Sequence, residues 1–111
     1  MTILAQLPAG AMLGRPFADY LNVTVPKDYA EEVKPRLLAL IEMLGPSAEC
    51  SPGQFSLFNA AGKPTGGSFL FRPRGKVLII GASGVALAAL RDAGLFGRYL
   101  EELAFFPHRV S

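Results

Sequence analysis

The chain has 111 residues, of which 50% are hydrophobic and 18% are charged. This composition fits one folded domain and excludes a disordered chain. No apolar run approaches the roughly 20 residues that cross a bilayer, and the apolar residues 1–13 lack the basic start of a signal peptide. Because the chain has one cysteine, Cys50, an internal disulfide is excluded, and we expect a cytoplasmic protein. Because it has no long apolar run, we expect no membrane partner. Charge is uneven, because residues 1–50 hold four basic and six acidic side chains and residues 51–111 hold seven and three.

The first third of the chain predicts a strand followed by a helix. Residues 17–25 alternate apolar and polar side chains and stop at Pro26, which indicates a half-buried strand. Residues 27–45 then show helical periodicity. The face expected to be buried carries Val33, Leu37, Leu40, Ile41 and Leu44.

The start of this helix is left open by the sequence. Asp28 and Glu31 have the spacing of a capping box, which favours a helix beginning at Asp28. Pro35 conflicts with one unbroken helix. Either the helix kinks at Pro35, or it begins near Lys34 with Pro35 in its first turn.

The middle of the chain predicts strands joined by short connections. We expect a polar loop at 46–54, a strand at 54–60, a loop at 61–67, and strands at 68–72 and 76–81 around a tight turn at 73–75.

The last third predicts two helices. Ser83 is the expected N-cap of the first, and Gly94 is a candidate for its C-cap. Its apolar stripe is Val85, Leu87, Leu90 and Ala93, and that of the second helix, in residues 95–106, is Phe96, Leu100, Leu103 and Phe106. Pro107 ends the second helix, and residues 108–111 look like the beginning of a further strand.

The predicted element order is β-α-β-β-β-α-α, which indicates an α+β fold. We expect a mainly antiparallel sheet of about four strands with the helices on one face. Residues 1–14 are expected to be a flexible leader and residues 15–111 a single domain, truncated at its C-terminal end.

Gly81 and Gly84 follow an apolar run, as the glycines of a dinucleotide-binding loop do. Such a site also needs a small residue where this chain has Leu87, and a parallel strand beyond the helix. Only 27 residues follow Gly84, and the strand before it is expected to pair in a hairpin. The favoured interpretation is a strand-to-helix corner, and a degenerate nucleotide-binding domain stays the weakest alternative.

Other catalytic and metal motifs are poorly supported. Ser83 misses the G-x-S-x-G spacing by one residue, and His108 is the only histidine that could form a triad with it. One cysteine and one histidine cannot make a structural zinc site. No catalytic, cofactor-binding or metal-binding residue is therefore predicted in this chain.

A basic cluster is the best candidate site. Arg72, Arg74 and Lys76 surround the expected turn, next to Phe69 and Phe71. Basic and aromatic side chains on a sheet bind single-stranded nucleic acid through phosphate contacts and base stacking. The alternative is that both phenylalanines point into the core and the arginines belong to a solvated turn.

Four short motifs, in the segments 17–26 and 83–111, resemble a known family. Phe17-Ala18-Asp19-Tyr20-Leu21, Ser83-Gly84, Leu90-Arg91 and Pro107-His108-Arg109-Val110-Ser111 resemble the N-terminal region of filamentous-phage-type rolling-circle replication initiation proteins. In that family the last motif continues into an Arg-Leu-Asp strand that carries an acidic residue, and the nicking tyrosine lies further downstream. The resemblance therefore implies that this chain lacks the catalytic residues of a DNA-nicking transesterase and its acid-bound divalent metal.

The hypothesis that follows is a non-catalytic N-terminal part of a replication initiator that contributes scaffold and DNA binding. Its expected partners are single-stranded DNA or an origin hairpin, the rest of the parent protein, and host replication proteins. The weak candidate DNA contacts are Arg72, Arg74, Lys76 and Arg109. The alternative from another class is a small, free-standing phage or mobile-element protein that binds a host protein.

Overall fold

The computed structural model describes residues 20–110. Its strands are β1 (Tyr20–Pro26), β2 (Ser47–Ser51), β3 (Gln54–Phe58), β4 (Pro64–Arg74), β5 (Val77–Ser83) and β6 (Arg109–Val110). Its helices are the 3-10 helix η2 (Lys27–Tyr29) and the α-helices α2 (Ala30–Met43), α3 (Gly84–Asp92) and α4 (Phe96–Ala104). The expected leader at 1–14, and the first residues of the expected first strand, lie outside this described range.

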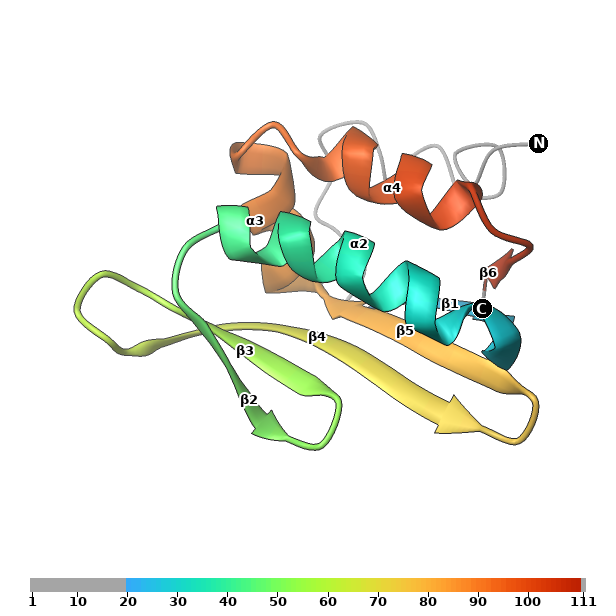
Figure 1. Cartoon of the computed structure of the whole chain (residues 1–111). Helices are drawn as coiled ribbons and strands as arrows, with labels where there is room; N and C mark the ends of the chain where they lie inside the picture. The colour runs from blue at the N-terminus through green and yellow to red at the C-terminus, as the bar shows by residue number, and fades with distance from the viewer. Residues whose placement is uncertain (1–19, 111) are drawn as a thin grey trace.

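The strands form one antiparallel sheet in the order β2-β3-β4-β5-β1-β6. All three α-helices cover the same face of the sheet (Figure 1). The predicted α+β class, antiparallel sheet and one-sided helices are confirmed, but the described sheet has six strands instead of about four. No helix of the described residues is long and apolar enough to cross a membrane.

The core lies between the sheet and the helices. The four residues Phe71, Ile80, Val23 and Val110 are paired in one row across β4, β5, β1 and β6, and the first three are buried. The buried helical side chains that pack against this side are Val33, Leu37, Leu40, Ile41, Ala86, Leu87, Leu90, Tyr99, Leu100 and Leu103. The predicted faces of α2 and α4 are thus mostly correct, although Leu44 and Phe96 are only partly buried.

Two expected loops are in fact strands. Residues 47–51 form β2, which pairs with β3 although most of its side chains are exposed. β4 begins at Pro64, inside the expected loop at 61–67, and runs to Arg74, while β3 ends at Phe58 instead of residue 60. The β4–β5 turn therefore consists of Gly75 and Lys76, instead of residues 73–75. Backbone pairing sets these bounds, and polar side chains on an edge strand give no apolar pattern to reveal it.

α2 begins at Ala30, so the proposed start near Lys34 is wrong and Pro35 lies inside the helix. The expected capping box is also wrong, because neither η2 nor α2 has a side-chain cap. Asp28 belongs to η2, which carries the chain from β1 into α2. A proline in this second turn removes the N–H that would bond to the carbonyl four residues earlier.

Ser83 caps α3, as the sequence predicts. Its Oγ accepts hydrogen bonds from the backbone N–H of Ala86 (3.2 Å) and of Ser68 in β4 (3.0 Å). The apolar stripe of α3 is shifted, because Val85 and Ala93 are exposed and Ala86 is buried instead. The C-cap is Ala93, and Gly94 follows it with a positive φ of 73°.

Replacing Ser83 with alanine should lower the free energy of unfolding by about 2 kcal/mol. The change leaves two backbone N–H groups without their acceptor, one at the start of α3 and one in β4. Urea unfolding followed by circular dichroism measures the loss. Ser83→Asp restores an acceptor and should recover part of the stability, and equal losses in both variants would contradict the capping role.

Candidate functional site

The open face of the sheet, which none of the described helices covers, carries a row of paired residues across four strands. Arg72 of β4 pairs with Ile79 of β5, Ile79 with Thr24 of β1, and Thr24 with Arg109 of β6. Directly paired residues of an antiparallel sheet point to the same face. Because the neighbouring row from Phe71 to Val110 points to the helices, Arg72 and Arg109 project from the open face, about 14 Å apart across three strand spacings.

The other two predicted cations lie at the same end of this face. Arg74 is two residues after Arg72, so it points the same way from a position about 7 Å along β4. Lys76 is exposed in the β4–β5 turn, and its carbonyl oxygen accepts a hydrogen bond from the N–H of Lys27 (2.9 Å). The structure thus brings the four sequence-predicted cations to one end of the sheet, but places Arg72 and Arg74 on a strand instead of a solvated turn.

No acidic residue of the described strands points to this open face. Glu49 is the only acid in these strands, and it pairs with Phe55, whose ring packs edge-on against Phe71 on the helix side. Among the described residues, the acids of the helical layer are Asp28, Glu31, Glu32, Glu42, Asp92, Glu101 and Glu102. The helical layer also holds basic residues, namely Lys27, Lys34, Arg36, Arg91 and Arg98. Charges of both signs therefore lie on the helical side, whereas the charged side chains of the described strands on the open face are all basic.

The four cations also lack acidic partners within the part of the chain that the structure describes. Two ion pairs occur there, Arg36 with Glu102 at 3.3 Å and Arg91 with Asp92 at 3.1 Å, and both belong to helices. The positive charge of the open face is consequently not neutralised from within the described protein. Such a face attracts polyanions and loses that attraction as salt rises.

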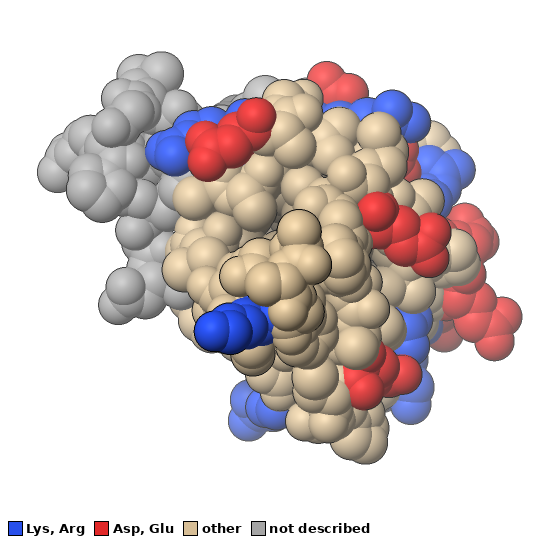
Figure 2. Space-filling model, turned by 90° about the vertical axis from the view of Figure 1, so that its left-hand side faces the viewer, with Lys and Arg blue, Asp and Glu red and all other residues tan. Residues whose placement is uncertain are grey.

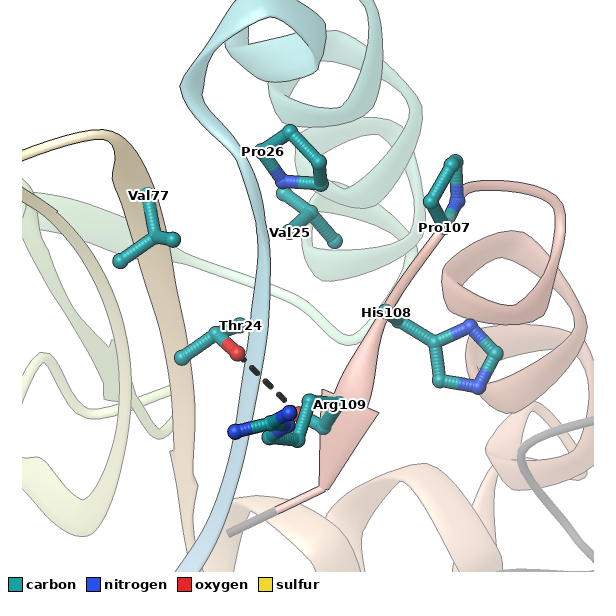
Figure 3. Close-up of a pocket in the computed structure, with 7 residues that line it drawn as sticks. All are labelled: Thr24, Val25, Pro26, Val77, Pro107, His108 and Arg109. Atoms are coloured by element: carbon teal, nitrogen blue, oxygen red, sulfur yellow. Dashed lines mark hydrogen bonds between the residues drawn. The ribbon is translucent and has the colours of Figure 1, made fainter.

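A pocket of about 290 Å³ lies where β1 meets the segment that leads into β6. Its lining residues are Thr24, Val25, Pro26, Val77, Pro107, His108 and Arg109 (Figure 3). The Oγ1 of Thr24 donates a 3.4 Å hydrogen bond to the carbonyl oxygen of Arg109, which joins β6 to β1 below the pocket. The pocket is mostly apolar, and Arg109 is the one residue with a permanent charge in its lining.

Ser83 and His108, the two side chains that a catalytic triad would need, are far apart. Ser83 pairs with Tyr20, whereas Arg109 pairs with Thr24, which is four residues or about 13 Å further along β1. The Ser83 hydroxyl already accepts two backbone hydrogen bonds, and the Nδ1 of His108 lies 2.8 Å from the carbonyl oxygen of Phe106. This arrangement gives Ser83 a structural role.

The Gly81–Gly84 corner does not have the strand arrangement of a dinucleotide-binding site. β5 runs antiparallel to both of its neighbours, β4 and β1, whereas the dinucleotide motif needs a parallel strand. Within residues 20–110, no three histidine, cysteine, aspartate or glutamate side chains gather in a way that could hold a metal ion.

The end of the molecule with α3 and the β3–β4 loop has no cluster of like charges among its described residues (Figure 2). Most of its surface is uncharged, and the few charged side chains on it are scattered and of both signs.

Phe69 and Phe71 do not belong to the open face. Both are buried on the helix side, at 1% and 3% exposure, and Phe69 packs against Tyr99 with ring centroids 5.8 Å apart. The sequence-based idea that they stack bases beside Arg72 is therefore wrong. Side chains alternate along a strand, so Phe71 and Arg72 point to opposite faces.

Two further side chains on the open face, Tyr20 and Asn22, were not predicted as site residues. Tyr20 and Asn22 alternate with Thr24 along β1 and so point the same way. The Oδ1 of Asn22 is buried without a hydrogen-bond partner, and it lies against Gly81 of β5. The alternation of residues 20–24 indicates that Tyr20, Asn22 and Thr24 share one face of a strand. Only the pairing of β1 with β5 shows that this face is the open one.

No protein-family model matches the chain, and no curated protein or solved structure is significantly similar to it. The geometry alone defines the class: an α+β domain with helices of mixed charge on one side of the sheet and, on the other, cations that no described acid neutralises.

Proposed function

We propose that this chain binds single-stranded DNA on the open face of its sheet. The observation that carries the proposal is the row from Arg72 to Arg109, two guanidinium groups on one face without an acidic neighbour in the described strands. Arginine binds phosphate through paired N–H donors, and a series of such contacts gives affinity without reading sequence. Arg74 and Lys76 extend the same surface toward the β4–β5 turn.

We further propose that the chain acts as the non-catalytic N-terminal part of a rolling-circle replication initiator. The resemblance in sequence supports this role, since two of its segments, around Tyr20 and Arg109, lie on paired neighbouring strands β1 and β6. The reading frame beyond Ser111 tests the assignment. A continuation into an Arg-Leu-Asp strand is expected, and a stop codon would contradict it and favour a free-standing protein that binds a host partner.

The affinity for single-stranded DNA should fall steeply with salt. Four phosphate contacts predict a loss on the order of 50-fold between about 50 and 200 mM salt. Fluorescence anisotropy of a labelled oligothymidylate measures this slope. Replacing Arg72, Arg74, Lys76 and Arg109 together with glutamine should remove most of both the affinity and the salt dependence.

A charge-matched control separates the open face from net charge. Replacing Lys34, Lys63, Arg91 and Arg98 with glutamine removes the same charge from the helices and the β3–β4 loop. This control should keep most of the affinity. Binding that is equal in the two quadruple variants, or absent in the unmodified chain at low salt, would refute DNA binding by this face.

A further inference from the structure

The side chain of Tyr20 is an exposed aromatic group on the open face. Within the described residues, the large hydrophobic side chains that are exposed are Tyr20, Met43, Val85 and Phe105. Tyr20 is the one of these four that belongs to the sheet, and it is 50% exposed. It pairs with Ser83 and points to the same side of the sheet as Thr24. Thr24 belongs to the row that holds Arg72 and Arg109.

The Tyr20 ring rests on the sheet at a place where a side chain is missing. A Cβ built at Gly81 would lie 3.0 Å from Cε1 of Tyr20 and 3.4 Å from the Cβ of Leu70. Gly81 is buried although it belongs to the open face, since Tyr20, Asn22 and Leu70 surround it. The sheet therefore supports one part of the ring, and the exposed half is left to solvent.

We propose that Tyr20 is a platform on which an unpaired base stacks, so that the open face selects single-stranded over duplex nucleic acid. This inference rests on the DNA binding proposed above and adds the chemical group that is recognised. Aromatic side chains beside a cationic track bind single strands in this way, because every base has a stackable face. The bases of a duplex are stacked on each other and do not reach such a ring.

The other exposed aromatic ring, Phe105, is differently placed. The guanidinium carbon of Arg36 lies 4.4 Å from the centroid of its ring, and the ring of Phe106 packs edge-on at 5.2 Å. Arg36 in turn pairs with Glu102 of α4. Phe105 is already in contact with a cation of the protein and lies at the end of α4, away from the sheet, so it serves as a matched control for Tyr20.

The position of Tyr20 fits a strand that also contacts the arginines. Tyr20 and Thr24 are four residues apart on β1, about 13 Å along the strand. Thr24 is the neighbour of Arg109 and, through Ile79, of Arg72. A single strand that stacks on Tyr20 and contacts these guanidinium groups therefore crosses the open face over a distance of several nucleotides.

Anisotropy with three probes tests the stacking: a short single-stranded oligonucleotide, the same backbone with abasic sites, and the duplex. The unmodified chain should bind the intact single strand on the order of tenfold more tightly than the abasic one. Tyr20→Ala should remove that difference and leave the salt dependence unchanged. Tyr20→Trp should keep it, and Phe105→Ala should bind all three probes as the unmodified chain does.

The outcomes distinguish this inference from the function on which it rests. Equal affinity of the unmodified chain for intact and abasic strands would overturn stacking while leaving phosphate binding intact. Wild-type affinity of Tyr20→Ala for the intact strand would overturn the role of Tyr20. Absence of binding to any probe would refute the proposed function itself.

Discussion

Replacing Gly53 with alanine is expected to lower the free energy of unfolding by about 3 kcal/mol or more. Gly53 lies in the β2–β3 turn with a φ of +76°, where an L side chain is strained. A Cβ there would also overlap the carbonyl oxygen of Phe71 in β4. The backbones of Gly53 and Phe71 lie this close because the N–H of Phe71 donates a 2.7 Å hydrogen bond to the carbonyl oxygen of Gly53. This bond joins the β2–β3 turn to β4.

Gly62 provides a control with nearly the same backbone angle. Its φ is +78°, but no atom lies within 4 Å of the position of its Cβ. Gly62→Ala should therefore cost only the backbone strain, about 1 kcal/mol. Urea unfolding of both variants separates the two effects, and equal losses would show that the contact with Phe71 contributes nothing.

The β2–β3 turn could have been predicted from the sequence, although residues 46–54 were expected to be a loop. Pro52-Gly53 is a strong signal for a tight turn, since proline presets φ at its first central position and glycine supplies the positive φ at the second. Of the two strands that flank it, β3 was predicted, and β2 was missed for another reason. β2 is an edge strand with exposed, mostly polar side chains, so only its hydrogen bonds to β3 reveal it.

The helices were easier to predict than the strands because burial imposes a periodicity on them. Leu37, Leu40 and Ile41 of α2 are buried as predicted, and so are Leu100 and Leu103 of α4. In α3 the predicted apolar stripe included Val85 by mistake, because the several alanines of this helix do not show from the sequence which of them are buried. Ala86 is fully buried, while the larger Val85 faces solvent.

The candidate site was only half accessible to sequence reasoning. The cluster of Arg72, Arg74 and Lys76 is local, so its composition is visible in one short segment. Arg109 joins the same face through Thr24, which is 85 residues away in the chain. Register between distant strands decides which side chains share a face, and a shift of one residue would have turned Arg72 toward the helices.

The second large effect concerns alkaline pH and Tyr99. This side chain is 1% exposed and packs against Phe69, and burial raises the pKa of its phenol well above the usual value of 10.0. The folded protein thus keeps the proton that the unfolded chain releases above about pH 10. The stability that this difference provides is fully present below pH 10, and we expect it to fall by about 1.4 kcal/mol for each further pH unit.

Tyr99→Phe isolates this contribution, because phenylalanine keeps the ring and has no proton to lose. The free energy of unfolding of the two proteins, measured in urea between about pH 8 and pH 12, should run parallel up to pH 10. Above that pH the unmodified protein should lose stability faster, since ionised Tyr99 is tolerated in the unfolded chain and excluded from the core beside Phe69. Parallel curves over the whole range would mean that the phenol reaches water in the folded protein, and that the contact between α4 and β4 opens far more readily than the buried ring implies.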